Sequence, residues 1–282
     1  EISACLVGSE MCIRDRGISY MAGSDLPAVI INVQRGGPGL GSIQPAQSDY
    51  YQATHAMGHG DFHILVFAPC SVQEMVDTVM KAFDKADEYR IPAMILADGL
   101  LGQMMEPVTF PPARETLPDK SDWAACGHGN KRPHHIINSL YLDAPLLEKN
   151  VKERFERYAI IEEHETDAEL YQCDDAELVV TAYGASARVA KSAVMTARKQ
   201  GLKVGLFRPK TLWPFPKKEL NQAIAHASQL LCVEMSMGQM IDDVRLAINC
   251  SRPVAFFGRT GGVIPTPAEV LAEIKKLMGG EA

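Results

Sequence analysis

Residues 28–49 read AVIINVQRGGPGLGSIQPAQSD, and the rest of the chain is organised around this stretch. Its first part, residues 29–33, is an aliphatic run that is too short to form a helix. Such a run is typical of a strand buried on both faces of a parallel sheet. We therefore predict a buried strand here, followed by a polar turn that begins at Arg35.

The turn combines one positive charge with little side-chain bulk. Arg35 is followed by Gly36 and Gly37 and, after Pro38, by two further glycines. A guanidinium stays protonated at any working pH, and glycine lets a ligand approach the backbone closely. Because ligands of open α/β sheets gather outside the carboxyl ends of the strands, this pattern predicts an anion site. The alternative is that Arg35 is a solvated loop charge and that the glycines only turn the chain.

The composition excludes several classes of protein. The 282 residues are 46 % hydrophobic and 22 % charged, as in ordinary globular proteins. The net charge of -7 and the lack of any basic run longer than a pair argue against nucleic-acid binding. No apolar run approaches the roughly 20 residues that span a bilayer, and the first residues show no signal-peptide pattern. We expect a cytoplasmic protein that binds neither nucleic acid nor membrane.

The cysteines do not suggest a metal centre. There are seven, an odd number, and no C-x-x-C spacing occurs: Cys5, Cys12, Cys70, Cys126, Cys173, Cys232 and Cys250. A closed zinc or iron-sulfur site needs several thiolates that converge, usually from short spacings. If the protein takes part in electron transfer, we expect the clusters to lie on another chain.

Strand patterns alternate with helix patterns along most of the chain. Strands are predicted at residues 29–33, 63–68, 93–97, 178–183, 203–207, 230–235 and 254–257. Helices are predicted between them, and capping boxes mark two helix starts, at Ser71 with Glu74 and at Thr266 with Glu269. This alternation predicts an α/β fold with parallel sheets.

The middle of the chain interrupts this pattern. Closely spaced prolines from residue 107 to residue 118 predict that regular structure stops there. A polar helix is predicted at residues 146–165, facing solvent, with Glu153 and Arg157 as an i,i+4 ion pair. We divide the chain into a non-native segment, a first domain, a linker with a connecting helix and a second domain, at residues 1–16, 17–112, 113–174 and 175–282.

Other motifs give weaker patterns. The glycines after the first strand are spaced G-x-G-x-G, and the acid that follows, Asp61, precedes the next strand, so a dinucleotide fingerprint is not supported. His55, His59 and His63 recur every fourth residue, but glycines break the helix that would align them on one metal. His59 alone is flanked by glycines and remains a candidate ligand-binding residue. No G-x-S-x-G motif points to a nucleophilic hydrolase.

Two methionine-rich stretches, residues 103–106 and 234–240, lie just past predicted strands. Methionine fills irregular gaps and adaptable contact surfaces, so packing or a subunit interface explains them better than redox chemistry. We predict an interface.

With these motifs in view, the chain resembles the alpha subunit of a 2-oxoacid:ferredoxin oxidoreductase, of the type that acts on 2-oxoisovalerate (3-methyl-2-oxobutanoate). The motifs that carry the resemblance are INVQRGGPGLG at residues 31–41, GHGD at 58–61, ILADG-x-x-GQMMEP at 95–107, AYG-x-S-x-R at 182–188, FRP-x-TL-x-PFP at 207–216, VEM-x-x-GQM at 233–240 and GRTGG at 258–262.

The resemblance implies a thiamine diphosphate enzyme that decarboxylates a 2-oxoacid, reduces ferredoxin and transfers the acyl group to coenzyme A. It implies a pyrimidine-type thiamine diphosphate domain followed by a transketolase-C-terminal-like α/β domain. The diphosphate, its magnesium and the iron-sulfur clusters would lie on partner subunits, beta and gamma with or without delta. Arg35 matches the arginine that pairs with the substrate carboxylate, and we assign Gly36, Gly37 and His59 to the same substrate site.

One departure from the family is expected to matter. The family's alpha chain begins with a Tyr-Pro-Ile-Thr-Pro segment and carries a later glutamate that activates thiamine, and neither can be matched before Gly17. We expect an N-terminally incomplete chain that is inactive by itself. Two alternatives stay open, the beta chain of a lipoamide-linked 2-oxoacid dehydrogenase and a non-catalytic scaffold subunit.

Overall fold

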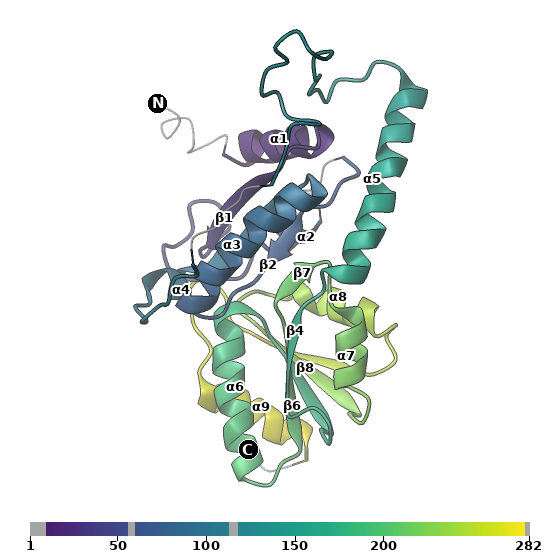
Figure 1. Ribbon diagram of the computed structural model, residues 1–282. Helices are drawn as coiled ribbons and strands as arrows, with labels where there is room; N and C mark the ends of the chain where they lie inside the picture. The colour runs from purple at the N-terminus through teal and green to yellow at the C-terminus, as the bar shows by residue number, and fades with distance from the viewer. Residues whose placement is uncertain (1–9, 56–59, 113–117, 280–282) are drawn as a thin grey trace.

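The protein consists of two α/β units, one above the other in Figure 1, as seen in a computed structural model that describes residues 10–55, 60–112 and 118–279. In α1 the side chains are described from Gly17 onward. The helices are α1 Glu10–Gly23, α2 Tyr50–Thr54, α3 Val72–Tyr89, α4 Gly99–Gln103, α5 Ala144–His164, α6 Gly184–Lys199, α7 Lys217–Ala223, α8 Met240–Ala247 and α9 Pro267–Leu277. The strands are β1 Ala28–Gln34, β2 Leu65–Phe67, β3 Pro92–Asp98, β4 Ala168–Tyr171, β5 Leu178–Thr181, β6 Val204–Pro209, β7 Thr211–Trp213, β8 Gln229–Glu234 and β9 Val254–Gly258.

Each unit is built on one sheet. The first sheet has the strand order β1-β3-β2-β7, and the second has the order β4-β6-β5-β8-β9. Parallel pairing dominates both, which confirms the predicted α/β fold, but β7 and β4 are antiparallel edge strands that the sequence pattern did not predict. They are three and four residues long, too short to show a period.

The two short strands also cross the predicted domain limits. β4 belongs to the second sheet although it lies in the predicted linker, and β7 belongs to the first sheet although it lies in the predicted second domain. The chain thus leaves β6 in one sheet and enters β7 in the other within two residues. The division into domains stays a prediction, and any such division has to accommodate these two crossings.

Buried aliphatic strands form the centre of both units. Every residue of β3 and of β5 is buried, as expected for strands covered on both faces. Figure 1 shows α6 and α9 on one side of the second sheet and α7 and α8 on the other. One apolar cluster joins β5, α6 and α9, and a larger one runs through the first sheet into α7 and α8.

The first strand, β1, contradicts the prediction that it is buried on both faces. It lies at the edge of its sheet and pairs only with β3. Its carboxyl half alternates, so that Asn32 and Gln34 are buried whereas Ile31 and Val33 are 55 % and 46 % exposed. The strand therefore turns polar side chains inward and aliphatic side chains outward.

Helix α5 is the long connector between the units, and it runs along the side of the molecule in Figure 1. The predicted Glu153–Arg157 pair does not form. Arg157 instead pairs with Asp25, as does the buried Arg154, which also donates to the carbonyl of Gly23 over 2.8 Å. One face of α5, with the buried Arg154, Tyr158 and Ile161, packs on the molecule, so the predicted solvent-facing helix is exposed on its remaining faces.

The proline-rich middle of the chain has no helix or strand in its described parts, residues 104–112 and 118–143, which confirms the prediction for those parts. No helix of the described residues is long and apolar enough to cross a membrane.

Candidate functional site: the loop after β1

The loop that follows β1, residues 35–45, closes on itself, and we call it the Arg35 loop. Its two ends meet in a bridge between Arg35 and Pro45. The Gly36 N–H donates to the carbonyl of Gln44 over 2.8 Å, and the Ser42 N–H donates to the carbonyl of Gly36 over 2.7 Å. The loop is therefore held by hydrogen bonds among its own residues, and the Ser42 hydroxyl adds one by accepting the Gln44 N–H over 3.0 Å.

A second glycine loop, from the other unit, lies directly against it. A Cβ added at Gly36 would come within 3.2 Å of the Gly261 carbonyl carbon, and one added at Gly262 would come within 2.3 Å of the Gln44 Cβ. The backbones of the two loops approach so closely that only glycine fits at Gly262. The motifs RGGPGLG and GRTGG lie more than 200 residues apart in the sequence, but their backbones pack against each other in the fold.

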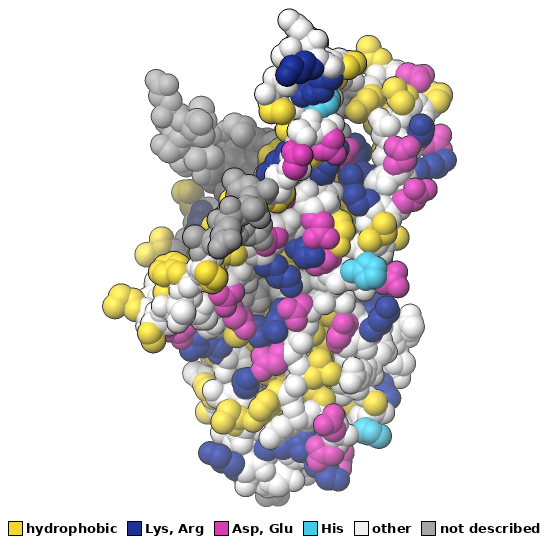
Figure 2. Space-filling model, viewed as in Figure 1, with side chains coloured by type: hydrophobic (Ala, Val, Ile, Leu, Met, Phe, Trp, Pro, Cys, Tyr) yellow, Lys and Arg dark blue, Asp and Glu magenta, His cyan; other side chains and the backbone are white. Residues whose placement is uncertain are grey.

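The Arg35 side chain is exposed, and one Nη1–H donates to the carbonyl of Leu40, within the same loop. Figure 2 shows one face of the molecule, on which Lys and Arg side chains are interspersed with Asp and Glu. The other N–H groups of Arg35 donate to none of the described residues, so most of the guanidinium fork is free for an anion. Gly37 is exposed, whereas Gly36 is buried and its N–H is already used. His59 lies outside the described residues, and the four predicted substrate contacts stay predictions.

Exposed apolar side chains occur on both sides of Arg35 along the chain: Ile31 and Val33 face outward from β1, and Leu40 and Ile43 belong to the Arg35 loop. We call this set the apolar rim, with its exposed fractions: Ile31 55 %, Val33 46 %, Leu40 80 % and Ile43 83 %. Single exposed apolar side chains are normal, but a group of four beside a free guanidinium is typical of an interaction site.

Polar side chains on the inner face of β1 hold the strand in place. Gln34 is 1 % exposed; its amide donates to the carbonyl of Ala97 over 3.3 Å and accepts the N–H of Asp49 over 3.0 Å. Asn32 donates to the Asp49 carboxylate over 3.2 Å. These bonds satisfy the buried amides and fix the outward direction of Ile31 and Val33.

The end of β3, beside the end of β1, carries a buried acid. Asp98 is 1 % exposed and accepts the N–H groups of Leu100, Leu101 and Ala185 over 3.0–3.1 Å. Burial raises the pKa of Asp98, and the three backbone hydrogen bonds oppose that rise. The carboxylate starts α4 and joins it to α6, so its role is to hold the units together.

A second buried acid holds the methionine-rich loop after β8. Glu234 is fully buried and accepts the N–H groups of Gln239, Met240 and Ile241 and the hydroxyl of Ser236. The methionines divide between two environments. Met240, like Met235, is buried in the core, whereas Met237 is 76 % exposed. Packing explains Met235 and Met240, whereas Met237 and, in the other stretch, Met105 at 96 % exposure are accessible, and the interface stays a prediction.

The described residues offer no cluster of side chains for the metal ion that accompanies thiamine diphosphate. Among residues 10–55, 60–112 and 118–279, no three His, Cys, Asp or Glu side chains are placed to hold a metal ion. Asp98 and Glu234 use their oxygens on backbone N–H groups. The side chains of these ranges therefore do not hold a metal ion by themselves.

Comparison with known families identifies the class of protein. Residues 14–177 match the family described as pyruvate flavodoxin/ferredoxin oxidoreductase, thiamine diphosphate-binding, and residues 176–270 match the core domain II of pyruvate:ferredoxin oxidoreductase. The chain therefore belongs to the 2-oxoacid:ferredoxin oxidoreductases, a family of oxidoreductases, and the predicted order of a thiamine-type domain and a second α/β domain is confirmed.

The relatives are subunits of such enzymes. The chain is 46 % identical to the ketoisovalerate oxidoreductase subunit VorB of Methanothermobacter marburgensis, over 96 % of this chain and 77 % of the relative. It is 33 % identical to the 2-oxoglutarate synthase subunit KorA of the same organism, over 96 % of this chain and 78 % of the relative.

A solved structure supports the fold. It is the 2-oxoglutarate:ferredoxin oxidoreductase of Magnetococcus marinus with 2-oxoglutarate, coenzyme A and succinyl-CoA bound, at 22 % identity and a TM-score of 0.78. The match covers 95 % of this chain and 52 % of the solved chain, so this chain spans about half of that relative.

Proposed function

We propose that the chain is the subunit of a 2-oxoacid:ferredoxin oxidoreductase that binds the carboxylate of a branched-chain 2-oxoacid through Arg35. Thiamine diphosphate, magnesium and the iron-sulfur clusters would be supplied by partner subunits, with coenzyme A as the acyl acceptor and ferredoxin as the electron acceptor. The observation that carries the proposal is the free guanidinium at the carboxyl end of β1, held beside the apolar rim.

The chemistry of the loop favours a substrate with one carboxylate. A planar guanidinium binds a carboxylate through two parallel hydrogen bonds. After Arg35, no charged residue occurs until Asp49, so the Arg35 loop offers no second cation for a dicarboxylate such as 2-oxoglutarate. Leu40 and Ile43 offer apolar surface instead, which suits an aliphatic side chain. The higher identity to the ketoisovalerate enzyme than to the 2-oxoglutarate enzyme supports the same choice.

The test is steady-state kinetics of the full complex with Arg35→Ala and Arg35→Lys. Loss of charge-assisted hydrogen bonds of about 1.5–3 kcal/mol should raise the KM for 3-methyl-2-oxobutanoate by about tenfold to hundredfold in the alanine variant. Lysine keeps the charge but cannot form two parallel hydrogen bonds, so the KM of Arg35→Lys should lie between those of the unchanged protein and of Arg35→Ala.

Arg245→Ala is the matched control, because Arg245 is a half-exposed arginine on α8 that forms only a surface pair with Asp242. An unchanged KM in Arg35→Ala would favour the scaffold subunit over the substrate-binding subunit. Reduction of lipoamide in place of ferredoxin would favour the lipoamide-linked dehydrogenase.

A further inference from the structure

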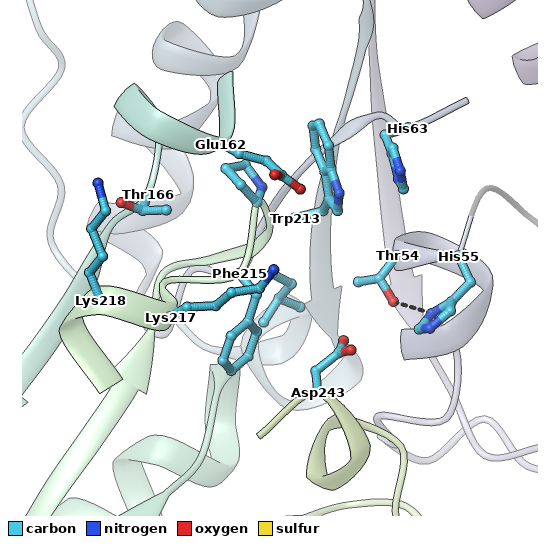
Figure 3. A pocket seen from close by; sticks show the side chains of 12 residues that line it. Thr54, His55, His63, Glu162, Thr166, Trp213, Phe215, Lys217, Lys218 and Asp243 are labelled. Atoms are coloured by element: carbon cyan, nitrogen blue, oxygen red, sulfur yellow. Dashed lines mark hydrogen bonds between the residues drawn. The ribbon is translucent and has the colours of Figure 1, made fainter. Parts of the chain in front are cut away.

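A cavity of about 370 Å³ lies between the two units, and none of its lining residues belongs to the Arg35 loop. It forms where the chain crosses from one sheet to the other, around Trp213 and Phe215. Figure 3 shows the side chains that line it, from α2, α5 and α8 and from the start of α7. Its size lies in the range of small-molecule sites, about 300–1,000 Å³.

One wall of the cavity is aromatic and fixed. The Trp213 ring stacks on the His63 ring, with centroids 4.5 Å apart and planes 9° apart, and Tyr158 packs edge-on against Trp213. Burial lowers the pKa of His63, so the stacked pair is uncharged at neutral pH. This wall, continued by Phe215, offers apolar surface to a bound group.

Charged side chains of both signs line the cavity. In Figure 3 the Lys217 ammonium extends toward the space between Glu162 and Asp243, whereas Lys218 is directed away, toward Thr166. Among the described residues neither Lys217 nor Glu162 has a hydrogen bond or a close ion pair, although the Lys217 charge acts on Asp243 and the Glu162 charge acts on His63.

A hydrogen bond from Tyr50 fixes the position of the Asp243 carboxylate. It accepts the hydroxyl of the fully buried Tyr50 over 2.6 Å, and its other oxygen accepts no hydrogen bond from the residues that the structure describes. The Lys217 ammonium and the Glu162 and Asp243 carboxylates therefore line the same cavity.

We infer that this cavity binds a zwitterionic α-amino acid with an apolar side chain. The ammonium of Lys217 would bind its carboxylate, Glu162 and Asp243 would bind its ammonium, and the aromatic wall would contact its side chain. A 2-oxoacid lacks the ammonium and would leave both carboxylates unpaired, so the cavity separates an amino acid from the corresponding oxoacid. This inference does not rest on the proposed function of Arg35.

Isothermal titration calorimetry on the full chain tests the inference. The probes are L-leucine, its oxoacid 4-methyl-2-oxopentanoate, and 3-methylbutan-1-amine, which lacks the carboxylate. L-leucine should bind, and each analogue should bind at least about tenfold more weakly, because one charged contact is lost.

Two variants assign the contacts. Lys217→Met should abolish the preference for L-leucine over the amine, and Glu162→Gln should reduce its preference over the oxoacid. The matched controls are Lys199→Met at the end of α6 and Glu156→Gln on α5, both exposed and outside the cavity, and both should bind L-leucine as the unchanged protein does.

The inference is overturned if L-leucine gives no binding heat, if the oxoacid or the amine binds as tightly, or if Lys217→Met binds L-leucine unchanged. A melting curve for each variant confirms that it is folded. The calorimetric test of the cavity and the KM test of Arg35 are independent, so the failure of one does not affect the result of the other.

Discussion

Gln47 and Tyr183 bind each other twice across the junction of the two units. The Gln47 side-chain amide donates to the Tyr183 carbonyl over 2.8 Å, and the Tyr183 hydroxyl donates to the Gln47 carbonyl over 3.2 Å. The Gln47 amide oxygen also accepts the Ser186 hydroxyl over 2.6 Å and the Met235 N–H over 3.0 Å. This one side chain thus joins the stretch after the Arg35 loop to α6 and to the end of β8.

Replacement of Gln47 by Ala should destabilise the protein strongly. Gln47 is fully buried, and its removal takes away the acceptor of the Met235 N–H and of the buried Ser186 hydroxyl. Each orphaned buried group costs about 1–3 kcal/mol, so we expect a loss of about 2–5 kcal/mol in the free energy of unfolding, measured by urea titration. Gln222→Ala, at an exposed position of α7, should change it by less than about 0.5 kcal/mol. Equal losses in the two variants would contradict the account.

Gly184 allows a second contact at the same junction. Its φ is +54°, and a Cβ there would lie 3.0 Å from the Gln47 Nε2 and 3.1 Å from the Asp98 Oδ2. Gly201 is the matched control, since its φ is +84° but a Cβ there would meet nothing within 4 Å. Gly201→Ala should cost about 1–2 kcal/mol for backbone strain alone, and Gly184→Ala at least about 1 kcal/mol more, by thermal or urea unfolding. Equal losses of unfolding free energy in the two variants would show that Gln47 and Asp98 can move to accommodate the added methyl group.

The features that could be predicted from sequence are those set by near neighbours. Both residues of the capping box at Thr266 lie within one turn, and it forms as predicted. At Ser71 only half of the box forms. The Ser71 hydroxyl accepts the Glu74 N–H, but the Glu74 carboxylate instead bonds Arg208, which is 134 residues away. A partner that distant leaves no local pattern.

The error at β1 has a similar cause. Asn32 and Gln34 alternate with aliphatic residues, but the largely aliphatic run at residues 29–33 favours a strand that is buried on both faces. Only the fold supplies the partners, Asp49 and the Ala97 carbonyl, that make it favourable to bury the two amides. For the same reason Arg35 could be predicted as a candidate from the end of one strand, whereas Gln47, which depends on three distant segments, could not.

The stability of the protein should fall in acid partly through Glu169. Burial opposes ionisation of this carboxyl, but hydrogen bonds from Lys191 and the buried Arg208 outweigh it and lower the pKa of Glu169. A carboxyl with a lowered folded-state pKa contributes stability above its ordinary value and loses it as the pH falls through the folded value. Urea titrations below about pH 4.3 should therefore show a shallower loss of stability in Glu169→Gln than in the unchanged protein.

At neutral pH the same variant should be less stable by about 1–3 kcal/mol, because Arg208 keeps Glu74 but loses one charged partner. Glu273→Gln serves as the control, since Glu273 forms only an exposed i,i+3 pair with Lys276. A control with the same change in pH dependence would show that Glu169 has no special part in acid unfolding.

The apolar rim should be covered by a partner subunit in the assembled enzyme. Leu40 and Ile43 are 80 % and 83 % exposed and extend from a loop that hydrogen bonds among its own residues hold in place. Charging both, in Leu40→Asp with Ile43→Asp, should leave the stability of the chain within about 0.5 kcal/mol, because surface substitutions rarely matter more. The same pair should weaken assembly at least about tenfold, since a carboxylate would have to be desolvated at the contact. Leu246→Asp, at a 68 % exposed site on α8, is the control and should assemble normally. If the double variant assembles as well as the control, the rim is open to solvent in the complex, and Arg35 would have to bind its substrate without a covering subunit.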